Sequence, residues 1–253
     1  ARFSDDFSSL VLHRTFQTGD KWQLIANDST DGRGGLNWGE GGSQYWVNPY
    51  NPNTSVSNLY SVVNGALRLG LMPTPASCQS WIDASAGQHM PYVGTLLNSC
   101  KTDFNLYGYY ALQLSVDRIP GLAFQFDLEC VPVVFAWPPE IDLRLYTDNQ
   151  NNMKVLFQVA IPNNGFQGIT LDNIDITVQH NYGIDWQSDH ISFWVDGQQK
   201  FSIANPGGPY QSQPCFCYLL TGSNYAANSG DPDPAKLPGY AWVYDYAVYN
   251  RKP

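Results

Sequence analysis

Short runs in which apolar and polar residues alternate recur along almost the whole chain. Residues two apart in a strand lie on the same face of a sheet, so this period of two favours half-buried β-strands. The clearest runs lie at residues 67–69, 109–116, 123–128, 154–159, 174–178 and 191–195. No segment keeps an apolar stripe of helical period over three turns. Helix should therefore be limited to a turn or two.

Turn-forming residues separate these runs. Asn64-Gly65, Asn163-Asn164-Gly165 and Asp196-Gly197 favour the tight turns of β-hairpins. Short strands joined by such turns are typical of an antiparallel sandwich. A sandwich of 253 residues commonly forms a single domain, and no linker or internal repeat divides the chain. We therefore predict one all-β domain over residues 1–253.

The charge and hydropathy of the chain argue against several classes of partner. The net charge is −9, whereas nucleic-acid binding requires a basic surface, so no nucleic-acid partner is expected. No run approaches the roughly 18 consecutive apolar residues that span a bilayer, so no membrane span is expected. The chain begins with Ala1 rather than Met, as a processed protein would. We expect a secreted protein, extracellular or periplasmic.

The chain has five cysteines, Cys78, Cys100, Cys130, Cys215 and Cys217. They lack the paired spacing, with histidine partners, that is typical of zinc sites. We expect Cys78 to form a disulfide with Cys100, which would suit an oxidising compartment.

The segment at residues 137–145, WPPEIDLRL, contains two acids and one base at alternate positions. In a strand, Glu140, Asp142 and Arg144 would project from one face of the sheet. Hydrolysis of a glycosidic bond with retention needs two carboxyls roughly 5–5.5 Å apart, one as nucleophile and one as general acid and then base. The segment therefore indicates a glycosidase site, or a site derived from one.

Motifs on both sides of this segment follow a known pattern. They lie at residues 92–97, 104–110, 121–124, 180–186 and 191–197, and the last two read HNYGIDW and ISFWVDG. Together with Glu140-Ile141-Asp142 they resemble glycoside hydrolase family 16, which includes laminarinases and lichenases. The resemblance implies a β-sandwich jelly roll of the concanavalin A-like kind, with a concave glycan-binding cleft.

The resemblance also implies roles for residues. The family's signature is E-x-D-x-E or E-x-D-x-x-E, in which the first Glu is the nucleophile and the Asp assists it. These roles fall on Glu140 and Asp142. The acid/base Glu that ends the signature falls on Arg144 or Leu145, and a guanidinium is no proton source near neutral pH. Gln125 likewise stands where the family carries a Trp of the cleft.

One hypothesis is an endo-acting retaining β-glycosidase in which another residue has replaced the acid/base. Asp127 and Glu129, on the preceding strand, and His180, at a family-like position, are the candidate replacements. The alternatives are ordinary edge carboxylates and a structural histidine. Arg144 would contact an acidic group of an anionic glycan or exopolysaccharide.

A second hypothesis is a catalytically inactive carbohydrate-binding protein on the same fold. Its stacking surfaces would come from the many aromatic residues, although a core position is the commoner alternative for any one of them. The candidate substrate-binding residues are Trp38, Tyr45, Trp46, Trp81, Gln125 and Trp137. A third hypothesis is a structural protein whose aromatic loops pack against a partner.

No cofactor is required by these hypotheses. Several members of the resembled family carry a structural calcium ion, bound by backbone and carboxylate oxygens. Asp5, Asp6 and Asp245 are the candidate ligands here. Their spacing does not form a recognised calcium loop.

Overall fold

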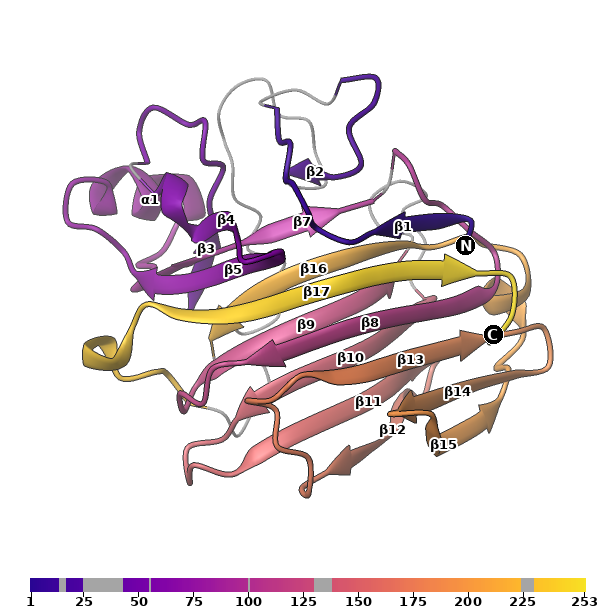
Figure 1. Cartoon of the computed structure of the whole chain (residues 1–253). Coiled ribbons are helices and arrows are strands. Elements are labelled where there is room, and N and C mark those ends of the chain that lie inside the picture. The colour runs from indigo at the N-terminus through magenta and orange to yellow at the C-terminus, as the bar shows by residue number, and fades with distance from the viewer. Residues whose placement is uncertain (14–16, 25–42, 55, 100, 130–137, 224–229) are drawn as a thin grey trace.

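The computed structural model describes residues 1–13, 17–24, 43–54, 56–99, 101–129, 138–223 and 230–253. Over these residues the chain forms two β-sheets that pack face to face (Figure 1). Trp38, Cys100, Cys130 and Trp137 lie outside the described residues. The predicted all-β sandwich is confirmed.

The larger sheet has ten strands among the described residues. Its order is β15 (Gln198–Ala204), β14 (His190–Val195), β13 (His180–Trp186), β8 (Gly108–Val116), β17 (Gly239–Tyr249), β5 (Ala66–Pro73), β6 (Tyr92–Gly94) and β3 (Gln44–Trp46), with β1 (Phe3–Asp5) beside β17 and β4 (Tyr60–Val63) beside β5. Strands β3 and β6 pair in parallel, and the other neighbours in this sheet run antiparallel.

The smaller sheet has seven strands in the described part of the chain. Its order is β12 (Gly165–Leu171), β11 (Met153–Ile161), β10 (Glu140–Thr147), β9 (Leu122–Glu129), β16 (Phe216–Ser223), β7 (Leu96–Asn98) and β2 (Gln23–Leu24). Strands β9 and β10 are central to it, so each is hydrogen-bonded on both sides.

Helix is limited, as the sequence predicts. The described helices are α1 (Gln79–Ala86) and three 3-10 turns, η1 (Ser57–Leu59), η2 (Gly208–Gln211) and η3 (Pro234–Lys236). Helix α1 ends at Gly87, whose φ of 71° is the left-handed conformation that glycine adopts readily. None of these helices is long and apolar enough to cross a membrane.

Two of the predicted hairpin turns have the backbone that their residues favour. Asn64 and Gly65 join β4 to β5 with φ values of 53° and 75°. Asp196 and Gly197 join β14 to β15 with φ values of 49° and 76°. Positive φ at both central residues matches the right-handed twist of the flanking strands. These turns fix the register of their hairpins.

Alternation along the strands builds the core between the two sheets. In β9 it buries Phe124, Phe126 and Leu128, and in β8 it buries Leu112 and Leu114, each at most 2% exposed. Burying an apolar side chain of this size contributes roughly 1.5–3 kcal/mol. The core therefore determines which face of each strand points away from it.

The strand predicted at residues 174–178 is wrong. The carboxylate of Asp175 accepts hydrogen bonds from the Thr177 N–H at 3.1 Å and the Thr177 hydroxyl at 2.6 Å. This local turn competes with strand pairing. Ile176 is nevertheless fully buried, and its carbonyl accepts the N–H of Val116 at 2.7 Å. The alternating pattern thus reflects a buried turn beside β8.

Candidate active site

Three charged side chains of β10 point away from the core. Glu140, Asp142 and Arg144 alternate with three aliphatic residues that lie in the core. The prediction that the three charged residues share one face is confirmed. That face is the outer surface of the seven-stranded sheet.

Strand β9 places three more polar side chains beside them. The antiparallel register sets Glu129 opposite Glu140, Asp127 opposite Asp142, and Gln125 opposite Arg144. Side chains directly opposite in such a pair have Cβ atoms about 4.5–5.5 Å apart. We call these six residues the polar array. The sequence marks all six as candidates, and the register shows which of them are neighbours.

Asp142 is held by donors from two strands. Its Oδ2 atom accepts a hydrogen bond from Gln158 Nε2 at 2.6 Å and another from Arg144 Nη2 at 3.1 Å. The same Nη2 atom lies 3.8 Å from Glu140 Oε1, so Arg144 bridges the two acids of the motif. Sequence reasoning does not identify Gln158, because this residue reaches Asp142 through the pairing of β10 with β11.

The polar array is almost as buried as the core. Asp142 and Gln125 are 0% exposed, Asp127 is 2% exposed and Arg144 is 9% exposed, while Glu129 is half-buried. Asp127 accepts a hydrogen bond from Gln125 Nε2 on its own strand. Three buried carboxyls, those of Asp127, Glu140 and Asp142, and the Arg144 guanidinium carry a desolvation cost. Departures of this kind from ordinary packing are expected at functional sites.

Tyr210, in η2, holds the start of β10. Its hydroxyl accepts a hydrogen bond from the Glu140 N–H at 3.1 Å, and it lies 2.6 Å from Ala160 O and 2.9 Å from Glu140 O, to either of which it can donate. Burial raises the pKa of Tyr210, so the hydroxyl keeps its proton. Tyr210 thereby fixes the backbone of Glu140. No sequence pattern marks it, because 70 positions separate the two residues.

A hydrophobic cluster lies on the same face as the polar array. It is separate from the core and contains Trp46, Leu96, Ala123, Tyr146, Phe216, Tyr218 and Leu220, with Leu156 packed against it. Phe216 and Tyr218 lie opposite Glu129 and Asp127 in the pairing of β16 with β9. Trp46 is 2% exposed and donates its Nε1–H to Thr221 O at 2.9 Å. Its ring is therefore packed inside the cluster and is not exposed for stacking on a sugar.

The structure contradicts the prediction that Tyr45 stacks on a sugar. Tyr45 is 0% exposed within the core between the sheets, and its hydroxyl is 2.8 Å from the Ser85 hydroxyl. Trp81, on α1, is half-buried and packs edge-on against Tyr45 with ring centroids 6.2 Å apart. The structure does not bring Trp81 into the polar array or the cluster beside it. Adjacent residues in a strand point to opposite faces, so Tyr45 and Trp46 cannot both face a ligand.

The prediction that His180 replaces the acid/base is also wrong. His180 begins β13 in the ten-stranded sheet, so the core separates it from the outer face that carries Glu140. Its Nδ1 atom is 2.6 Å from Asp196 Oδ2 in the turn after β14. The histidine therefore has a structural role, which was the alternative to catalysis in the sequence analysis.

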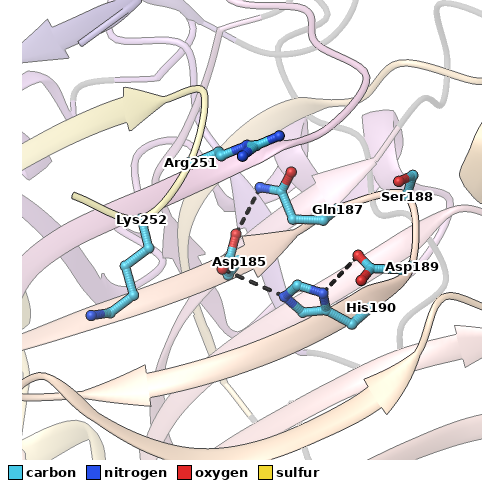
Figure 2. A pocket seen from close by; sticks show the side chains of 7 residues that line it. All are labelled: Asp185, Gln187, Ser188, Asp189, His190, Arg251 and Lys252. Carbon is cyan, nitrogen blue, oxygen red and sulfur yellow. Dashed lines mark hydrogen bonds and ion pairs between the residues drawn. The ribbon is translucent and has the colours of Figure 1, made fainter.

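A polar pocket of about 560 Å³ lies on the ten-stranded sheet (Figure 2). Its lining consists of Asp185, Gln187, Ser188, Asp189, His190, Arg251 and Lys252. Figure 2 shows His190 between two carboxylates: Nδ1 is 2.8 Å from Asp189 Oδ1 and Nε2 is 3.5 Å from Asp185 Oδ2. Each carboxylate of the pocket is thus paired with the imidazole.

The described residues offer little support for the predicted calcium site. No group of three or more His, Cys, Asp or Glu side chains within them is arranged to hold a metal ion. Asp5 accepts hydrogen bonds from Trp22 Nε1 at 2.7 Å and Lys21 Nζ at 3.2 Å, and Asp6 accepts one from the Ser8 N–H. These carboxylates are already used by protein donors. Structural calcium stays a prediction.

The chain was compared with protein families and with known proteins. The family model described as glycosyl hydrolases family 16 matches residues 52–240, which include all of β9 and β10. The chain belongs to this family. Family 16 membership confirms the resemblance seen in the sequence.

Two curated relatives come from Rhizobium meliloti (strain 1021). Endo-1,3-1,4-beta-glycanase ExsH is 24% identical over 248 residues, and endo-1,3-1,4-beta-glycanase EglC is 23% identical over 247 residues. Each alignment covers 96% of this chain and 50% of the relative. The family 16 chain therefore spans about half the length of the curated relatives it matches.

Solved structures show the same fold. The laminarinase catalytic domain from Thermotoga maritima MSB8 superposes with a TM-score of 0.75 at 17% identity, covering 99% of this chain and 98% of that one. The Bacillus licheniformis beta-glucanase superposes with a TM-score of 0.67 at 20% identity, covering 99% and 98%. Identity at this level supports the family 16 sandwich alone.

Proposed function

We propose that the protein is an endo-acting retaining β-glycosidase with Glu140 as nucleophile and Asp142 as its assisting carboxylate. The observation that carries this proposal is the register of β9 with β10, which sets a second carboxyl directly opposite Glu140. Retention requires two carboxyls roughly 5–5.5 Å apart. Membership of family 16 supports the same reaction class.

The contacts within the polar array suit these roles. Arg144 lies 3.8 Å from the carboxylate of Glu140 and 3.1 Å from that of Asp142, so one guanidinium bridges the two acids. A charged Glu140 can attack the anomeric carbon of a sugar. Gln158 and Arg144 both bind Oδ2 of Asp142, so Asp142 is fixed beside the nucleophile.

The proposed substrate is a β-linked polysaccharide of the glucan type. The two curated relatives are endo-1,3-1,4-beta-glycanases, which supports this class. Arg144, at the position of the family's acid/base, extends the proposal to an anionic glycan or exopolysaccharide with an acidic group near that end of the array. Because a polymer of this size does not cross a membrane unaided, the proposal also places the protein outside the cytoplasm.

The test is cleavage by the parent protein and by Glu140→Gln. Mixed-linkage β-1,3-1,4-glucan, laminarin, agarose and carrageenan are the probes, and new reducing ends and product size are measured. We expect the parent to cleave at least one of these polymers into oligosaccharides, and Glu140→Gln to lower the rate by more than about 10⁴-fold. Asp189→Asn, in the pocket of the other sheet, is the control and should retain the parent rate. A Glu140→Gln protein as active as the parent would refute the role of Glu140.

A carbohydrate-binding protein without catalysis is the second candidate function. The observation that favours it is Arg144, which stands where the family has its proton donor. The same array would then bind sugar hydroxyls through its carboxylates. Retardation of the parent and of Glu140→Gln in a gel containing one of these polymers, with no new reducing ends, would support binding over hydrolysis.

A further inference from the structure

We propose that Glu129 is the general acid and base of this enzyme, in place of the carboxyl that family 16 carries at the end of its signature. The inference rests on the proposed function and names the proton donor that this function requires. It comes from the position of Glu129 in the sheet, directly across from Glu140.

Glu129 is the member of the polar array best placed to exchange a proton with a substrate. Asp127 is 2% exposed and Asp142 is 0% exposed. Glu129 is half-buried at the end of β9, so its carboxyl can be reached. An acid that protonates a glycosidic oxygen must contact that oxygen.

The spacing of Glu129 and Glu140 suits a retaining mechanism. Directly opposed residues in an antiparallel pair have Cβ atoms about 4.5–5.5 Å apart. Retaining glycosidases hold their two carboxyls roughly 5–5.5 Å apart, whereas inverting enzymes separate theirs by about 6.5–9.5 Å. Two glutamate side chains of equal length that extend side by side from such a pair can hold their carboxyls at the shorter of these separations, so we expect retention of configuration at the anomeric carbon.

The side chains around the pair also indicate which of the two carboxyls carries the proton. Two carboxyls facing each other cannot both ionise without repulsion, so one of them tends to keep its proton. Arg144 lies 3.8 Å from Glu140, whereas Glu129 stands opposite Glu140, four positions along the ladder from Arg144. The guanidinium therefore favours Glu140 as the anion. In the proposed mechanism Glu129 is then the partner that carries the proton, as a general acid must.

The reaction then balances as follows. The Glu140 carboxylate attacks the anomeric carbon while the bond from that carbon to the glycosidic oxygen breaks, and the leaving oxygen takes the proton of Glu129. The Glu129 carboxylate next takes a proton from water, and the resulting hydroxide attacks the anomeric carbon. The ester bond to Glu140 breaks, which restores the Glu140 carboxylate and the Glu129 acid.

The first test is the rate of Glu129→Gln on the polymer that the parent cleaves fastest. Glutamine keeps the shape of the side chain and removes the proton, so we expect a loss of about 10²–10⁴-fold. The thermal melting curve checks that the variant is folded. A folded Glu129→Gln protein within about threefold of the parent rate would overturn the inference while leaving the proposed function intact.

The second test separates a catalytic from a structural role. The probe is the β-glycosyl fluoride of the smallest oligosaccharide that the parent releases, because fluoride leaves with little need for an acid. With Glu129→Ala, azide should enter the space of the missing carboxyl, attack the glycosyl-enzyme and give a β-glycosyl azide at an increased rate. Azide should not accelerate the matched variant Asp127→Ala. A Glu129→Ala rate that azide does not raise would overturn the inference.

The failure of the proposed function gives a different result. In that case the parent itself would release no reducing ends from any of the four polymers. That outcome would remove the inference together with the enzyme on which it rests.

Discussion

The two faces of the paired strands β9 and β10 are similarly buried but have opposite chemistry. On the core face, Phe126 and Leu143 are 0% exposed and contact other apolar side chains. On the outer face, Asp127 and Asp142 are at most 2% exposed and contact amides and a guanidinium. Burial alone therefore does not distinguish the core from the site. The difference lies in what each side chain contacts.

The comparison shows how one ladder serves two purposes. Apolar burial on the core face contributes stability, whereas desolvation of the outer carboxyls costs stability unless donors compensate for it. Strict alternation keeps the two sets apart, because every second side chain belongs to the other face. The predictions below alter one face at a time.

The largest effect is expected on the outer face, from Arg144→Met. This change leaves the carboxylates of Glu140 and Asp142 without their cation while keeping a long side chain. Removing one partner of a buried ion pair costs about 3–5 kcal/mol. Urea denaturation should show this loss in the free energy of unfolding. A loss below about 1 kcal/mol would mean that water already screens the pair.

The next largest effect is expected one residue away, on the core face. Leu143→Ala removes buried apolar contacts and leaves a cavity, at a cost of about 2–5 kcal/mol. Because Leu143 points away from the polar array, the rate per folded molecule should stay near that of the parent. Urea denaturation and reducing-end assays at a temperature where both proteins are folded measure the two quantities. A large loss of rate in folded protein would show that the two faces are coupled.

An intermediate effect is expected from Tyr210→Phe. This change removes hydrogen bonds to the backbone at the start of β10 and leaves the side chains on both faces of the strand unchanged. The variant loses the hydrogen bonds of the hydroxyl to the backbone of Glu140 and Ala160. An unsatisfied buried backbone group costs about 1–3 kcal/mol. We expect that loss in urea denaturation, together with a lower kcat and a nearly unchanged KM. An unchanged kcat would show that Tyr210 has no part in positioning Glu140.

The smallest effect is expected from a carboxyl buried in the interior, Asp103. Burial raises the pKa of Asp103, against hydrogen bonds from Asn105 and Tyr246 that lower it. The folded state therefore binds this proton more tightly than the unfolded state, and stability falls as the pH rises from the ordinary carboxyl range to the raised pKa. Asp103→Asn has no proton to release at this position, so its stability should not fall over this pH range. Melting temperatures of the parent and the variant should converge at low pH and separate above it, with the variant higher.

Local sequence predicts one face of a strand but not its neighbours. The period of two correctly places Glu140, Asp142 and Arg144 together. The pairing of Glu129 with Glu140 depends on the register between two strands, which no single run of residues contains. Tyr210 is further removed, since it reaches β10 from a different part of the chain.

The errors have equally physical causes. Tyr45 and Trp46 are neighbouring aromatics, and the sequence does not say which one faces the core. Residues 174–178 alternate like a strand, yet the side chain of Asp175 closes a turn. His180 fits the family's motif but belongs to the other sheet. A motif can place a residue along the chain without placing it in space.

The ladder of β9 and β10 also bears on how such a site can evolve. Opposed positions on neighbouring strands stand at nearly the same distance everywhere in a sheet, as the points of a lattice do. A proton donor lost from one position of such a ladder can thus be replaced at another position by substitution, with no movement of the backbone. Under the proposed assignment the donor stands on β9 directly across from Glu140, four positions along the ladder from Arg144.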